Sequence, residues 1–130
     1  MILAYWCVLI AAFMPVAFVA YAKFFCGQKM DMDSNRYPRR WLEQTEGAQQ
    51  RAYWAQLNGF EAFPPFAAGV IIATIAGGSV AVINLLAVLF VLLRIVYGGC
   101  YIADRASARS LVWSAATACT VLLFVVGAIG

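Results

Sequence analysis

The sequence contains no histidine, and this absence excludes a wide range of chemistry. Serine–histidine–acid triads, HExxH zinc sites and imidazole proton relays all need this side chain. The four cysteines have no CxxC or other zinc-like spacing, so we expect isolated thiols and no metal site. Any chemistry must therefore come from Arg, Tyr, Ser, Glu, Asn or Cys side chains.

Charged residues are also scarce: they make up 12% of the 130 residues, whereas 65% are hydrophobic. An ordinary soluble domain is about 45–50% apolar and about 25% charged. A soluble chain of this size could not bury so much apolar surface, because the ratio of surface to volume rises as chains become shorter. The composition predicts an integral membrane protein. Its net charge of +3 forms no aromatic-interleaved basic stripe, so no nucleic-acid partner is expected.

The apolar segments are long enough to cross a membrane, since a hydrocarbon core about 30 Å thick takes about 20 helical residues. They predict one all-α domain over residues 1–130, a transmembrane four-helix bundle. Its spans are expected at about residues 2–24, 48–76, 80–102 and 108–129, with a cytosolic loop over about residues 25–47. A turn at residues 77–79 divides an uncharged run that is too long for one crossing. Pro15 and the pair at 64–65 are expected to bend their helices.

Basic residues flank these spans on one side only. They are Lys23, Lys29, Arg36, Arg39 and Arg40 in the first loop, and Arg105 and Arg109 in the last link. The positive-inside rule predicts that both basic segments are cytosolic and that both termini lie on the opposite side of the membrane. The first span lacks the basic start of a signal peptide, and the short chain without a targeting signal suggests a bacterial inner membrane.

Polar side chains recur at helical spacing inside the spans. Those of the second span are Arg51, Trp54, Asn58 and Glu61, and those of the third are Arg94, Tyr97 and Tyr101. Each set shares one helix face, and the antiparallel spans bring the two sets to similar depth, beside Arg109 and Ser110 of the fourth span. Charges inside a membrane are costly and mark functional sites by default. The pattern predicts a basic, tyrosine-lined cavity that opens toward the cytosol.

A purely structural explanation exists for each of these residues. Glu61 could form an ion pair with Arg94 or Arg51 that only holds the bundle together. The tyrosines are typical of the interfacial aromatic belt, and Arg109 is typical of a positive-inside anchor. The convergence of several such groups at one depth favours a site.

The segment from Arg51 to Phe66 reads RAYWAQLNGFEAFPPF. It is similar to the signature of the MAPEG family, the membrane-associated proteins in eicosanoid and glutathione metabolism, with AQxNxxExFPxF as the specific core. The agreement extends to Arg94, Tyr97 and Tyr101 and to the Arg109-Ser110 pair, and it covers the chain except for the first loop.

The resemblance implies a homotrimer that binds glutathione, as co-substrate, in cytosol-facing clefts between subunits. It implies that Asn58 and Glu61 contact glutathione and that Arg94, Tyr97 and Tyr101 line the cleft. Trp54 stands where eicosanoid-branch members usually carry an arginine, and we expect Arg51, one turn earlier, to contact a glutathione carboxylate in its place.

The catalytic residues implied by the resemblance are Arg109, which stabilises the glutathione thiolate, and Ser110, an alternative thiol activator. A thiol with a pKa near 8.5 is mostly protonated at neutral pH, and an adjacent cation lowers that pKa. The expected activity is that of a glutathione transferase or peroxidase, acting on a lipophilic electrophile or hydroperoxide from the surrounding membrane lipids. The alternative is a non-catalytic membrane protein that holds a lipid or other small amphiphile in the same cleft, which the indoles of Trp54 and Trp113 favour.

Overall fold

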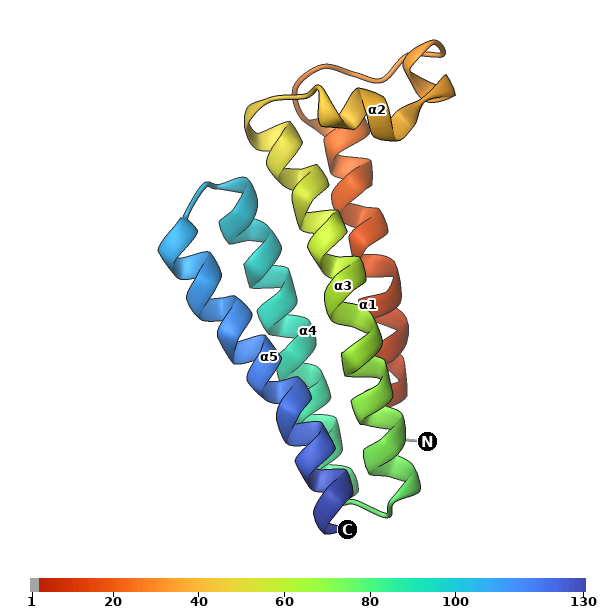
Figure 1. Ribbon diagram of the computed structural model, residues 1–130, viewed down its shortest axis with the longest axis vertical. Helices are drawn as coiled ribbons and strands as arrows, with labels where there is room; N and C mark the ends of the chain where they lie inside the picture. The colour runs from red at the N-terminus through yellow and green to blue at the C-terminus, as the bar shows by residue number, and fades with distance from the viewer. Residues whose placement is uncertain (1–2) are drawn as a thin grey trace.

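The computed structural model describes residues 3–130, and these residues contain helices and connecting turns but no strand (Figure 1). The long helices are α1 (Leu3–Ala20), α3 (Gly47–Ile75), α4 (Val80–Ile102) and α5 (Ala106–Ile129). A π-helical turn, Tyr21–Phe25, extends α1. Each of the four is long and apolar enough to cross a membrane. The predicted fold class, an all-α membrane bundle, is confirmed.

The segment between α1 and α3 contains short helices as well as loop. A 3-10 turn, Ser34–Arg36, precedes α2 (Pro38–Glu43), which lies across one end of the bundle (Figure 1). Proline at the first position of α2 supplies a backbone angle suited to a helix start. Leu42 is buried with Ala22 and Ala52, so α2 is held by apolar contact with the long helices. The prediction of a loop over this whole segment was therefore wrong in its middle, where tertiary packing stabilises a short helix.

The prolines inside the long helices do not interrupt them. Pro15 lies within α1, and Pro64 and Pro65 lie within a continuous α3. Directly after Pro65, the ring of Phe66 stacks on that of Phe90 in α4, with centroids 3.9 Å apart and planes 4° apart. This pair belongs to the main apolar core, to which all four long helices contribute.

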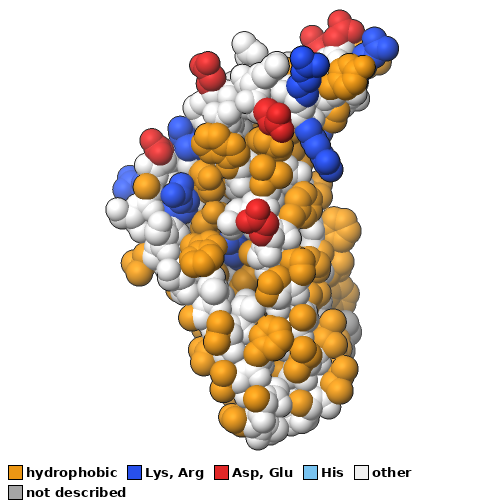
Figure 2. Space-filling model, in the orientation of Figure 1, with side chains coloured by type: hydrophobic (Ala, Val, Ile, Leu, Met, Phe, Trp, Pro, Cys, Tyr) orange, Lys and Arg blue, Asp and Glu red, His pale blue; other side chains and the backbone are white. Residues whose placement is uncertain are grey.

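The helices run up and down, so that α1 begins and α5 ends at the same end of the bundle (Figure 1). At the opposite end lie α2 and the turn between α4 and α5. Charged side chains gather toward that end, whereas the rest of the visible face is largely hydrophobic (Figure 2). Both basic segments of the chain therefore share one end, and the polar parts of α3, α4 and α5 lie toward it.

Candidate functional site

A hollow of about 200 Å³ lies between α3, α4 and α5. Its polar lining comes from Asn58 and Glu61 of α3, Arg94 of α4, and Thr117 and Thr120 of α5. The remaining lining is apolar: Ala62, Pro65, Phe90, Trp113 and Ala116. We call this space the inner hollow.

Arg94 is the most buried charge in the inner hollow, with 3% of its surface exposed. Among the described residues, its Nη2 has no hydrogen-bond partner, and neither does Oδ1 of Asn58. The guanidinium carbon lies 4.1 Å from the centroid of the Tyr97 ring. Buried polar groups are nearly always paired, because an unpaired group carries its full desolvation penalty. Two buried polar atoms without partners therefore belong to residues that line the inner hollow.

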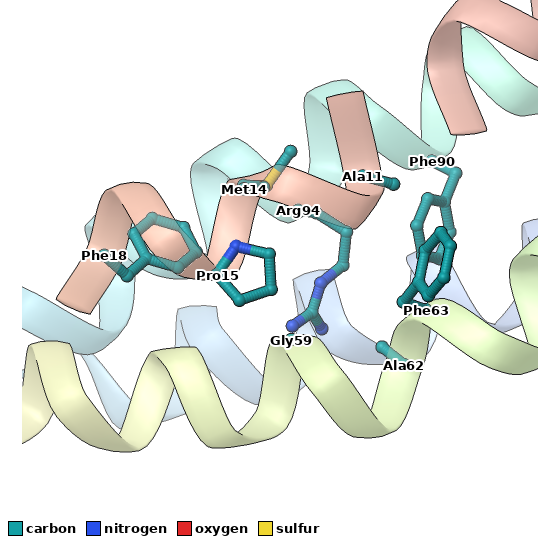
Figure 3. Close-up of a pocket in the computed structure, with 9 residues that line it drawn as sticks. All are labelled: Ala11, Met14, Pro15, Phe18, Gly59, Ala62, Phe63, Phe90 and Arg94. Carbon is teal, nitrogen blue, oxygen red and sulfur yellow. The ribbon is translucent and has the colours of Figure 1, made fainter. Parts of the chain in front are cut away.

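The packing around Arg94 decides on which side a ligand could lie. Its side chain extends from α4 toward Gly59 of α3, and Pro15 of α1 lies alongside (Figure 3). The free space on this side is about 10 Å³, enough for one water molecule at most. The inner hollow, on the α5 side, is about 200 Å³. A ligand larger than water must therefore approach Arg94 between α3 and α5.

A second and larger hollow, of about 430 Å³, adjoins the first toward the charged end of the bundle. Its lining residues are Tyr97, Tyr101, Arg109, Ser110, Trp113 and Ser114. We call it the outer hollow. The guanidinium carbon of Arg109 lies 4.6 Å from the Tyr101 ring centroid, and the Tyr101 ring meets that of Tyr97 edge-on at 5.7 Å. Two arginines are thus linked by two tyrosine rings in a column that runs from one hollow to the other.

The predicted site residues divide between these two spaces. Asn58, Glu61 and Arg94 line the inner hollow. Tyr97, Tyr101, Arg109 and Ser110 line the outer hollow. The indole of Trp113 lies in the wall of both, so the structure has two adjoining hollows where the sequence suggested one cavity.

Arg51 lines neither hollow. Its Nε and Nη2 donate hydrogen bonds of 3.1 and 2.9 Å to the backbone carbonyl oxygen of Ile102 at the end of α4. Trp54, one turn further along α3, packs near Tyr101 with ring centroids 6.4 Å apart. The structure therefore shows Arg51 in contact with the α4 backbone, outside the space where a glutathione carboxylate was expected.

Sequence reasoning missed the contribution of α5 to the inner hollow. Thr117 and Thr120 line it, and Thr120 is 8% exposed. A signal was present, because Ser110, Trp113, Thr117 and Thr120 are separated by three, four and three residues, the same spacing as the polar stripe of α3. Small hydroxyl side chains in an apolar helix are easily taken for packing residues.

The chemistry available at this site is that of anion recognition. Two guanidiniums supply positive charge, Glu61 and Asn58 supply acceptors, and threonine and tyrosine hydroxyls can donate or accept. Within residues 3–130, no group of three or more His, Cys, Asp or Glu side chains could hold a metal ion. All four cysteines are free thiols. The site is suited to an anionic, hydrogen-bonding molecule that lies against an apolar wall.

Comparison with known proteins identifies a family. Neither the curated proteins nor the solved structures include a match to this chain. The model of the MAPEG family, in contrast, matches residues 3–129, which is nearly the entire chain. The match includes all the helices that form the two hollows. This integral membrane protein belongs to the MAPEG family.

Proposed function

We propose that this protein binds glutathione in the two hollows and activates its thiol for attack on lipophilic electrophiles or hydroperoxides. The observation that carries the proposal is the convergence of Asn58, Glu61 and Arg94 on one hollow, which adjoins a second hollow bordered by Arg109. Glutathione has two carboxylates, one ammonium and two amides. Arginines suit its carboxylates, and Glu61 and Asn58 suit its ammonium and N–H groups.

Thiol activation is assigned to the outer hollow. Arg109 borders it and carries a charge that it does not lose at any physiological pH. A guanidinium beside sulfur lowers the thiol pKa and so raises the thiolate population. Ser110 borders the same space and can donate a hydrogen bond to the sulfur.

The thiolate sulfur would then form a bond to an electrophilic carbon as the leaving group departs with the electron pair. With a hydroperoxide, two glutathione molecules supply two electrons and two protons, so that the products are an alcohol, water and glutathione disulfide. Membrane lipid brings the lipophilic substrate to the apolar rim of the hollows, where Trp113 lies 43% exposed.

The assembly in this proposal is a homotrimer with the hollows at the subunit boundaries. The support is membership of the MAPEG family; in such an assembly the exposed apolar surface of the long helices, including Phe13 of α1, Leu92 of α4 and Val121 of α5, is divided between lipid and neighbouring subunits. The positive-inside rule assigns the charged end to the cytosol, where glutathione is found, and the termini to the other side of a bacterial inner membrane.

A second candidate function is non-catalytic binding of a lipid or other small amphiphile. The observation that favours it is the apolar side of the inner hollow, where Phe90, Trp113 and Ala116 would pack against an acyl chain. Arg94 would then hold an anionic headgroup.

Calorimetry with glutathione and the ultraviolet absorbance of its thiolate distinguish the two candidates. We expect the purified protein to bind glutathione as a thiolate and Arg109→Ala to lower the thiolate fraction at neutral pH about tenfold or more, because a neighbouring cation lowers a pKa by about 1–3 units. Arg105→Ala is the matched control, since it removes an exposed cation at the start of the same helix, outside both hollows. A wild-type protein that binds no glutathione, and keeps a co-purified lipid in its presence, would overturn the enzymatic proposal.

A further inference from the structure

Helix α4 ends in a left-handed cap. Asp104 has a φ of +60°, and the turn is closed by Asp104 N–H donating to the Tyr101 carbonyl and Arg105 N–H donating to the Cys100 carbonyl. This is the usual arrangement at a helix C-terminus, with aspartate where glycine is most common. Within the described turn, no backbone N–H reaches the Ile102 carbonyl oxygen.

Arg51 of α3 supplies the missing donors to that oxygen. Its Nε and Nη2 lie 3.1 and 2.9 Å from the Ile102 oxygen, so one guanidinium donates two hydrogen bonds to a single carbonyl group. The carbonyl end of a helix carries a partial negative charge, which strengthens bonds from a cation. The contact joins residues that are 51 positions apart and fixes the end of α4 to the first turns of α3.

Two residues close to this contact, Tyr101 and Arg109, line the outer hollow. Tyr101 precedes Ile102, and its ring packs near Trp54 on one side and under the Arg109 guanidinium on the other. The turn at 103–105 that follows Ile102 determines where α5 begins, and Arg109 lies in the first turn of α5. A shift of the α4 end would therefore move Tyr101 and Arg109 together.

We infer that Arg51 is a positioning residue that places Tyr101 and Arg109 at the outer hollow by clamping the Ile102 carbonyl. The effect of Arg51 on the glutathione thiolate rests on the proposed function. The contact between Arg51 and the Ile102 carbonyl, which we call the clamp, does not depend on that function. This positioning role is an alternative to the expectation that Arg51 binds a glutathione carboxylate, since two of the five N–H donors of the guanidinium are directed at the Ile102 oxygen.

The clamp is tested first without any ligand, by hydrogen exchange of the backbone amides of residues 103–105. We expect Arg51→Ala to speed their exchange about tenfold or more, because hydrogen bonds from charged donors contribute most to local stability. Arg51→Lys keeps the charge but loses the forked donor, so it should give an intermediate rate. The control Arg105→Ala removes a nearby exposed cation and should leave exchange at Ala103 and Asp104 unchanged. Equal exchange in wild type, Arg51→Lys and Arg51→Ala would overturn the clamp.

The link to chemistry is tested in the glutathione-bound protein. Positioning predicts that Arg51→Ala and Arg51→Lys raise the pKa of the bound thiol while the glutathione Kd stays near that of wild type. A direct carboxylate contact predicts the reverse pattern for Arg51→Ala, a Kd raised about tenfold or more with an unchanged thiol pKa. That reverse pattern would refute positioning. If wild type binds no glutathione, the proposed function fails and the exchange rates still decide the clamp. If Arg51→Ala does not fold, Arg51→Lys provides both measurements.

Discussion

Gly59 of α3 packs so near Pro15 of α1 that there is no room for a side chain between them, and this contact offers a sharp test of the packing. A Cβ added to Gly59 would lie 2.7 Å from Cγ of Pro15 and 3.3 Å from its Cβ. A proline ring is tied to its own backbone at both ends and cannot swing aside as a flexible side chain would. Gly59→Ala must therefore push α1 away from α3 beside Asn58 and Arg94.

The expected magnitude comes from two opposing effects. Overpacking a well-packed core costs about 1–3 kcal/mol. Alanine gains up to about 1 kcal/mol over glycine inside a helix. We expect Gly59→Ala to be net destabilising by about 1 kcal/mol, from the difference between these two effects. Because Asn58 is the adjacent residue, weaker binding in the inner hollow should accompany the loss of stability.

The assay is the free energy of unfolding in detergent, measured for a set of matched variants. Gly99→Ala is the control, since no atom lies within 4 Å of a Cβ added at that exposed position of α4, and it should be neutral or stabilising by up to about 1 kcal/mol. In a Pro15→Ala background the 2.7 Å contact with Cγ is removed and only the 3.3 Å contact with Cβ remains, so Gly59→Ala should cost less stability than it does in the wild-type background. If Gly59→Ala is stabilising in both backgrounds, the assigned contact between α1 and α3 is wrong.

Three further predictions concern caps and turns. Asp104→Gly should stabilise the protein by up to about 1 kcal/mol in the same unfolding assay, because glycine adopts a φ of +60° without strain; a loss of stability would contradict this. Asn84→Ala should destabilise it by about 1 kcal/mol, because the Asn84 side chain accepts a 2.9 Å hydrogen bond from the Ala4 N–H at the start of α1, and no change would show that this bond contributes nothing. Hydrogen bonds from the hydroxyl and N–H of Ser34 lower the pKa of Asp31, so the loop is stabilised above the ordinary pKa of aspartate and loses that contribution as pH falls through the lowered value. Ser34→Ala should bring the Asp31 pKa closer to its ordinary value in an NMR titration, and an unchanged pKa would refute the assignment.

The fold class could be predicted from the sequence because lipid leaves few alternatives. Long apolar runs must satisfy every backbone group internally, so they become helices, and short polar links make neighbouring helices antiparallel. The short helix α2 could not be predicted in this way. Its residues are mostly polar or charged, and its stability depends on Leu42 finding an apolar site formed by Ala22 and Ala52, which are distant in sequence.

The grouping of the candidate site residues could be predicted from the sequence, but their division between two hollows could not. Helical spacing and antiparallel direction are enough to bring Asn58, Glu61 and Arg94 together, since they require only the period of the helix and the order of the spans. The division into two hollows depends on where the Trp113 indole lies, and that depends on packing.

The partner of Arg51 was beyond sequence reasoning for a different reason. A carbonyl group is present at every residue, and only the turn geometry shows which carbonyl remains without a backbone donor. A glycine after α4 would have indicated the left-handed cap, but the chain has Asp104 at that position. The polar stripe of α3 therefore contains one residue whose partner is a helix end, although its spacing matches that of the residues that line the inner hollow.

Arg94 is the residue of the inner hollow that most favours the proposed ligand-binding role over a purely structural one. A buried arginine that only held the bundle together would be expected to have its donors satisfied by protein groups, because an unpaired buried charge is strongly destabilising. Among the described residues, Nη2 of Arg94 has no hydrogen-bond partner, and neither does Oδ1 of Asn58, whose residue lines the same hollow. The space on the α1 side of Arg94 is about 10 Å³, whereas the inner hollow is about 200 Å³, so only the inner hollow has room for a molecule larger than water. Sequences depart from the ordinary rules of burial mainly at functional sites, where stability is lost for the sake of binding. Under the proposed function, an anion bound in the inner hollow would compensate for the cost of burying Arg94.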